Sequence, residues 1–133
     1  MNEVNIVKEE CTIWEEILIS QICEMFQFPF RRGVNIYKEI TPNQTTFVIF
    51  DIVMGVNVFK CNIFVDDKDR ITGYIYDNNH VNWDFYILRV HDNVFTYYVE
   101  RKYGEPKIGA VPEECAIRLN AIISDSTRQA KKN

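Results

Sequence analysis

The two histidines and the aspartates near them are the residues of this chain with types suited to acid–base chemistry. Asp77, His80 and Asp84 lie close together in sequence, and His91-Asp92 follows after one predicted strand. A carboxylate beside an imidazole can orient it as a general base or join it in binding a metal ion. An eight-residue strand spans roughly 25 Å, so we expect the two histidines to lie apart. We favour a surface turn at residues 77–80 and predict no catalytic residue and no metal site, although the sequence leaves a chemical role for this group open.

Motifs that identify common hydrolases are absent. The chain has no G-x-x-x-x-G-K-[ST], no H-E-x-x-H and no G-x-S-x-G, which excludes P-loop nucleotide hydrolysis. The run Asp66-Asp67-Lys68-Asp69 lacks the glycine and glutamate spacing of a calcium loop. Arg31 and Arg32 form either an anion-binding pair for a phosphate or carboxylate, or a solvated pair between a helix and a strand. We therefore predict that the protein is not an enzyme and has no cofactor.

The cysteines and the N-terminus indicate the compartment. Cys11, Cys23, Cys61 and Cys115 are widely spaced, with no Cys-x-x-Cys pair, which predicts reduced and buried thiols. The N-terminal residues lack the pattern of a signal peptide, and the apolar runs are too short to span a membrane. We expect a cytoplasmic protein that does not bind membranes.

Negative charge is concentrated near the N-terminus. The chain carries −4 overall, and residues 1–30 hold one lysine and six glutamates, which gives −5 for that segment. A phosphate backbone would be repelled there, so we expect no nucleic-acid ligand. Glu15, Glu16 and Glu24 form a candidate partner-binding face, with an ordinary solvated helix face as the alternative.

Hydrophobic periodicity predicts the elements that carry these residues. From residue 10 to 28 apolar residues recur at steps of three and four, and Pro29 ends the run. A second such pattern covers residues 112–128 and opens with a proline and two glutamates. Between them the period is two, with short turn sequences, which predicts strands at about 34–40, 46–53, 57–65, 71–76, 83–90 and 94–103. The fold class is α+β, with an antiparallel meander sheet of five to six strands and an N-terminal and a C-terminal helix packed on one face. We expect a single domain over residues 1–133.

Some predicted strands are apolar on both faces. Residues 47–54 and 83–90 place apolar side chains at both alternating positions, which is typical of strands covered on two sides. Two helices cover one face, so we expect the other to be covered by a second copy of the chain, by a partner, or by curling of the sheet into a half-barrel. A homodimer is the leading interpretation. Tyr74, Tyr76 and Tyr86 form a candidate aromatic binding face, or else ordinary cross-strand pairs.

Two hypotheses about function follow. The first is a small acidic protein-binding module of the inhibitor, immunity, anti-defence, adaptor or chaperone type. The order helix, antiparallel strands, helix in an acidic chain of this length is similar to that of type III secretion chaperones, which have a further helix among the strands that this sequence does not predict. The alternative is a small-molecule or nucleotide-binding domain, possibly hydrolytic, with a pocket between sheet and helices near Arg31, Arg32 and His80.

Overall fold

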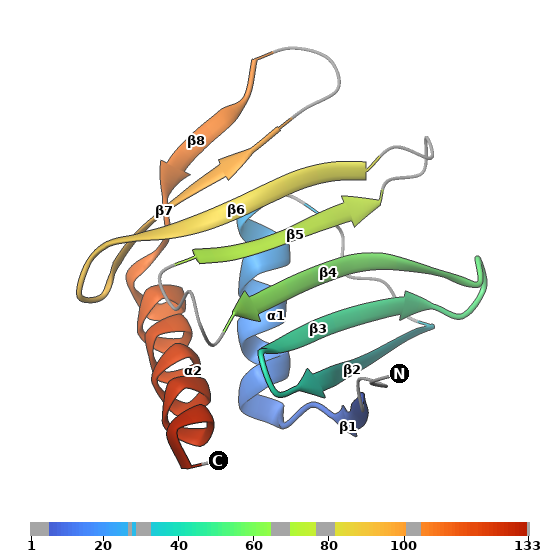
Figure 1. Ribbon diagram of the computed structural model, residues 1–133. Helices are drawn as coiled ribbons and strands as arrows, with labels where there is room; N and C mark the ends of the chain where they lie inside the picture. The colour runs from blue at the N-terminus through green and yellow to red at the C-terminus, as the bar shows by residue number, and fades with distance from the viewer. Residues whose placement is uncertain are drawn as a thin grey trace, which may run out of the picture.

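A computed structural model describes residues 6–26, 28, 33–64, 70–76, 82–100 and 105–132, and for residues 70, 82 and 125–132 it describes the backbone alone. The eight strands of this part of the chain form one antiparallel sheet in the order β1 to β8, each strand beside its neighbour in sequence (Figure 1). The elements in chain order are β1 (Val7–Glu10), α1 (Ile13–Met25), β2 (Val34–Thr41), β3 (Gln44–Asp51), β4 (Val56–Phe64), β5 (Arg70–Tyr76), β6 (Asn82–His91), β7 (Val94–Val99), β8 (Lys107–Ala110) and α2 (Glu113–Lys132). The predicted α+β class and antiparallel sheet are confirmed, and the predicted five to six strands are corrected to eight.

Helix α1 begins at a capping box. The Thr12 hydroxyl accepts a hydrogen bond from the backbone N–H of Glu15 (3.1 Å), and the Glu15 carboxylate accepts one from the backbone N–H of Thr12 (2.8 Å). These bonds satisfy two of the N–H groups that a helix start leaves without partners. The helix therefore starts at Ile13, and its last turn closes at Phe26, so it is shorter than the predicted 10–28. Strand β1 precedes it.

One hydrophobic core joins both helices to the inner face of the sheet. Figure 1 shows α1 crossing behind β4 and β5, with α2 beside it. Phe26, at the end of α1, lies 4.7 Å from Phe85 and 5.3 Å from Tyr97 between ring centroids. Burial of large aromatic and aliphatic side chains is the main favourable term in folding. The core also includes Leu18, Ile19, Ile22, Phe47, Ile49, Phe59, Cys61, Ile63, Ile71, Ile87, Phe95, Cys115, Ala116, Leu119 and Ile123.

The predicted strand boundaries are wrong at three places. Strand β1 was not predicted, and β8 lies between the last predicted strand, at 94–103, and the predicted helix at 112–128. Residues 52–55, part of which was expected to continue a strand, form the turn between β3 and β4. The Asp51 carboxylate accepts hydrogen bonds from the backbone N–H groups of Val53 (2.9 Å) and Met54 (3.0 Å), and Gly55 takes the positive φ of 71° that the turn requires.

Neither described helix is long and apolar enough to cross a membrane.

Candidate functional site

The sheet has a core face and an outer face, which alternate along each strand. On β6, Phe85 and Ile87 belong to the core, so Tyr86 and Leu88 point to the outer face. On β2 to β5 the outer face is mixed: Tyr37, Val48 and Phe50 lie on it, and Thr46 donates a hydrogen bond to Asn62 (2.9 Å) across β3 and β4. Val48 is already buried by its neighbours, and the Thr46–Asn62 pair satisfies polar groups within the sheet.

The outer face of β6, β7 and β8 is apolar and exposed. We define the β6–β8 patch as Tyr86, Leu88, Val90, Val94, Tyr98 and Ile108. The exposed fractions are 66% for Ile108, 65% for Val90, 51% for Val94, 40% for Leu88 and 37% for Tyr86. The Tyr86 and Tyr98 rings stack at 4.8 Å with an interplanar angle of 17°, which gives the patch a rigid aromatic centre.

Charged groups lie at the ends of this surface. Asp84 and Glu100 are exposed at one end of β6 and β7, and their backbones are joined by a hydrogen bond of 2.8 Å. At the other end, the His91 Nε2 lies 3.4 Å from Asp92 Oδ2, and both side chains are exposed. Among the described outward-facing residues of β6 to β8 between these ends, Thr96 is the polar side chain. The arrangement is an apolar centre with a charged rim, as in many protein interfaces.

The three predicted tyrosines do not form one surface. Tyr86 belongs to the β6–β8 patch, whereas Tyr76 is half-buried and packs against the core. Tyr74 lies on the outer face opposite Lys60 of β4. Burial raises the pKa of the Tyr74 hydroxyl above its usual value, although a hydrogen bond with Asn57 acts in the opposite direction. The phenol therefore stays protonated at neutral pH.

Of the three glutamates predicted to bind a partner, Glu15 forms an ion pair inside the protein. Both of its carboxylate oxygens lie 2.9 Å from the Lys38 ammonium of β2, and the two side chains are 13% and 15% exposed. The same carboxylate completes the capping box with Thr12. The Glu15 carboxylate is therefore not available to bind a partner.

Glu16 and Glu24 are exposed on α1 but belong to different places. Glu16 lies in the first turn of the helix, in a segment where Ile13, Trp14 and Ile17 are also exposed. Glu24 lines a cleft of about 460 Å³ between the end of α1 and the start of α2, together with Glu113 and Glu114. Across the two helices, Arg118 donates a hydrogen bond to Gln21 (3.1 Å). The predicted acidic face is thus divided between a helix start and an interhelical cleft.

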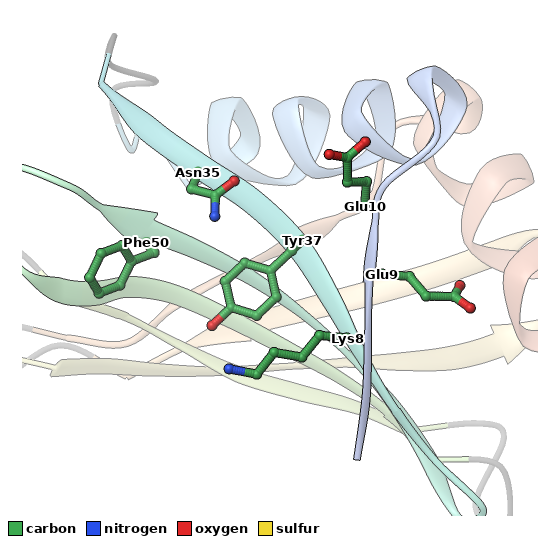
Figure 2. A pocket seen from close by; sticks show the side chains of 6 residues that line it. All are labelled: Lys8, Glu9, Glu10, Asn35, Tyr37 and Phe50. Carbon is green, nitrogen blue, oxygen red and sulfur yellow. The ribbon is translucent and has the colours of Figure 1, made fainter.

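A groove of about 450 Å³ lies on the outer face where β1 departs from β2. Its lining consists of Lys8, Glu9, Glu10, Asn35, Tyr37 and Phe50. Figure 2 shows Lys8 extending beside the Tyr37 ring, while Glu9 points to the other side of β1. The Lys8 Nζ lies 5.5 Å from the ring centroid, within the range of a cation–π contact. Two aromatic rings and one amide make a surface on which a planar molecule can stack, and the two carboxylates outnumber the single lysine, so the groove does not favour an anion.

The described residues show no anion-binding, acid–base or metal site built from the other residues that the sequence suggested. Arg31, Arg32, Asp77 and His80 lie outside the described residues, as does the run Asp66 to Asp69. In the described part of the chain, no group of three or more His, Cys, Asp or Glu side chains is arranged to hold a metal ion. Cys23, Cys61 and Cys115 are buried and free. Burial raises the pKa of the Cys23 and Cys115 thiols to about 12, which keeps them protonated and unreactive.

Of the β6–β8 patch the sequence predicted only Tyr86 as a binding residue, because the six residues come from three strands and become neighbours only through strand pairing. The apolar side chains at both alternating positions of residues 83–90 were the sequence feature that indicated an apolar outer face on this strand. Comparison of the chain with protein-family models, with curated proteins and with solved structures found no match.

Proposed function

We propose that the protein is a small acidic protein-binding module that associates stoichiometrically with a protein target through the β6–β8 patch. The observation that carries the proposal is the concentration of exposed apolar and aromatic side chains on one rigid part of the sheet. Isolated apolar residues are normal on a protein surface, but a contiguous group is typical of an interaction site. The absence of a catalytic motif from the sequence is consistent with this role.

The geometry favours a partner with an apolar, shape-complementary surface. Stacked tyrosines offer a large contact area with little conformational entropy to lose on binding, and they are enriched in interface centres. Asp84 and Glu100 at the rim add a preference for positive charge at one end of the partner. Inhibitor, immunity, anti-defence and adaptor proteins all act by such association.

A comparison of two lysine variants tests the proposal. Leu88 in the patch and Ile17 on α1 are almost equally exposed, at 40% and 41%, and lie on opposite sides of the molecule. We expect Leu88→Lys to lose the stoichiometric partner that the wild-type chain recovers from its native host, because the lysine charge would be desolvated in the interface. Ile17→Lys should retain that partner. Loss with Ile17→Lys and retention with Leu88→Lys would reject the patch.

The acidic cleft between the helices gives a second test of the same function. If Glu24 binds the partner, Glu24→Lys should weaken the complex by reversing a charge at the cleft, and the effect should shrink at high salt. Asp84→Lys, on the opposite face, is the matched charge reversal. An effect of Glu24→Lys alone would place the partner on the helices instead of the sheet.

A second candidate function is the binding of a small aromatic molecule in the groove of Figure 2. Its volume of about 450 Å³ falls in the range of small-molecule sites, Tyr37 and Phe50 supply stacking surface, and Lys8, Glu9 and Glu10 supply charges of both signs. Thermal unfolding with a panel of nucleosides, aromatic amines and aromatic carboxylates tests it. A ligand at a hundred times its dissociation constant adds about 2.7 kcal/mol of stability. The shift should vanish in Lys8→Ala and remain in Lys60→Ala; no shift with any member of the panel would reject this function.

A further inference from the structure

Strands β1 and β8 are the two ends of the described sheet, and they differ in how well they are protected. Natural proteins block the edge of a sheet with charged residues, prolines or short strands, because an open edge can pair with another chain. Strand β1 carries three consecutive charges at Lys8, Glu9 and Glu10. Strand β8 is as short as β1 and lies between Pro106 and Pro112, but the last three residues of its sequence Lys107-Ile108-Gly109-Ala110 are uncharged. Figure 1 shows no strand or helix beside its free edge.

The pairing of β8 with β7 determines which backbone groups point to that free edge. The backbone N–H of Val111 donates to the carbonyl of Phe95 (2.9 Å), and Gly109 and Lys107 lie opposite Tyr97 and Val99 in the same ladder. Backbone groups alternate in direction along an antiparallel strand. The N–H and C=O groups of Ile108 and Ala110 therefore point away from β7, toward the free edge.

We propose that the β8 edge binds a second copy of β8 to form a two-fold symmetric dimer. In an antiparallel register centred on Gly109, Ile108 of one copy lies opposite Ala110 of the other. All outward N–H and C=O groups of the two residues then find partners across the two-fold axis, giving four intermolecular hydrogen bonds. The two neighbouring registers with the same face alignment leave some of these groups without partners: one centred on Ile108 places Ala110 opposite Pro106, one centred on Ala110 places Ile108 opposite Pro112, and neither proline has an N–H.

Charge and side-chain packing also favour a second copy of β8 at this edge. In this register Lys107 lies opposite Val111 of the other copy, so the two lysines are kept apart, and each lysine side chain points to the core side near Tyr97. Ile108, which is 66% exposed, would pack across the axis against Ala110 of the other copy. Because the axis is perpendicular to the sheet, the two β6–β8 patches would lie side by side on one face and could bind a partner bivalently.

Sedimentation velocity of the full chain over a wide concentration range tests this dimer. We expect a monomer–dimer equilibrium in the wild type and a monomer in Ala110→Pro, which removes an outward N–H that the ladder with β7 does not use. Ile108→Asp should also be monomeric, because it places a charge at the paired edge. The matched control is Val90→Asp, equally exposed on β6 but away from the edge, which should still dimerise. Circular dichroism of each variant checks that it is folded.

Covalent trapping gives a second measurement that does not depend on a weakened fold. In the proposed register, cysteines at 108 and 110 of different copies lie about 5.5 Å apart between Cα atoms, within disulfide range. Ile108→Cys/Ala110→Cys should therefore yield a disulfide dimer on mild oxidation, whereas Ile108→Cys alone should not.

A wild-type chain that stays monomeric at every concentration would overturn the dimer, as would dimerisation that survives both Ala110→Pro and Ile108→Asp, or that is lost in Val90→Asp. The partner proposal is tested separately from the dimer. Recovery of the partner by the monomeric Ala110→Pro variant can be compared with recovery by the Ala110→Pro/Leu88→Lys double variant.

Discussion

Glu15 connects the start of α1 to the second strand of the sheet. Its carboxylate accepts a hydrogen bond from Thr12 and lies 2.9 Å from the Lys38 ammonium through each oxygen. The sequence predicted the helix but placed Glu15 on a partner-binding face, because periodicity does not show which acidic residue meets a cation from a distant strand. Glu16, the next residue, is exposed and makes no such contact in the described part of the chain. The capping pattern Thr12-x-x-Glu15 was the signal that could have separated the two glutamates.

We predict that Glu15→Gln lowers the free energy of unfolding by about 1 to 3 kcal/mol, because the half-buried Lys38 ammonium loses the nearer of its two carboxylate partners and keeps only Glu9, at 3.8 Å. Glu16→Gln should change stability by less than about 0.5 kcal/mol, as is usual for an exposed substitution. Urea denaturation of the two variants checks both values. Equal effects of the two substitutions would show that the Lys38 contact contributes nothing to stability.

At the scale of elements, the strongly periodic segments were predictable and the sheet edges were not. Strand β1, with the sequence Val-Lys-Glu-Glu, has no alternation because it is held by backbone pairing with β2 at the sheet edge. Strand β8 contains Gly109 and follows Pro106, residues that ordinarily indicate a loop. The predicted strand at 46–53 runs two residues into the turn because Ile52 and Val53 are apolar, although both are exposed. A local pattern cannot record pairing with a distant strand.

Gly73 on β5 is a position where the packing of elements allows only a glycine. A Cβ there would overlap the carbonyl oxygen of Lys60 on β4 and lie 2.6 Å from the Phe85 ring on β6. We predict that Gly73→Ala lowers the free energy of unfolding by at least about 1 to 3 kcal/mol, the usual range for overpacking. Gly55→Ala, where a Cβ meets open space but φ is 71°, should cost about 1 kcal/mol. Chemical denaturation gives the ranking, and a larger loss for Gly55→Ala would contradict the described packing.

For the whole molecule, the described strands form an open sheet with helices on one face, and its end strands β1 and β8 do not pair with each other. The sequence predicted that the second face needs a cover because strands are apolar on both sides. The structure shows a finer division: on the outer face of β2 to β5 polar pairs such as Thr46 and Asn62 lie among apolar side chains such as the buried Val48, whereas the apolar side chains of β6 to β8 are exposed. Alternation along one strand could suggest an apolar face, but its extent depends on which strands are neighbours.

Site-specific photo-cross-linking is the measurement that tests the β6–β8 patch most directly. A photoreactive maleimide can be attached at Val94→Cys in the patch or at Val7→Cys on β1, two positions of nearly equal exposure. Both labels are introduced in a Cys11→Ser background, because Cys11 is only half-buried; the other native thiols are buried, with the pKa of Cys23 and Cys115 raised to about 12, and should not compete for the label. In extract of the native host, irradiation should give one discrete adduct from position 94 and none from position 7. The same adduct from position 7, with none from position 94, would contradict the assignment of the patch as the binding surface.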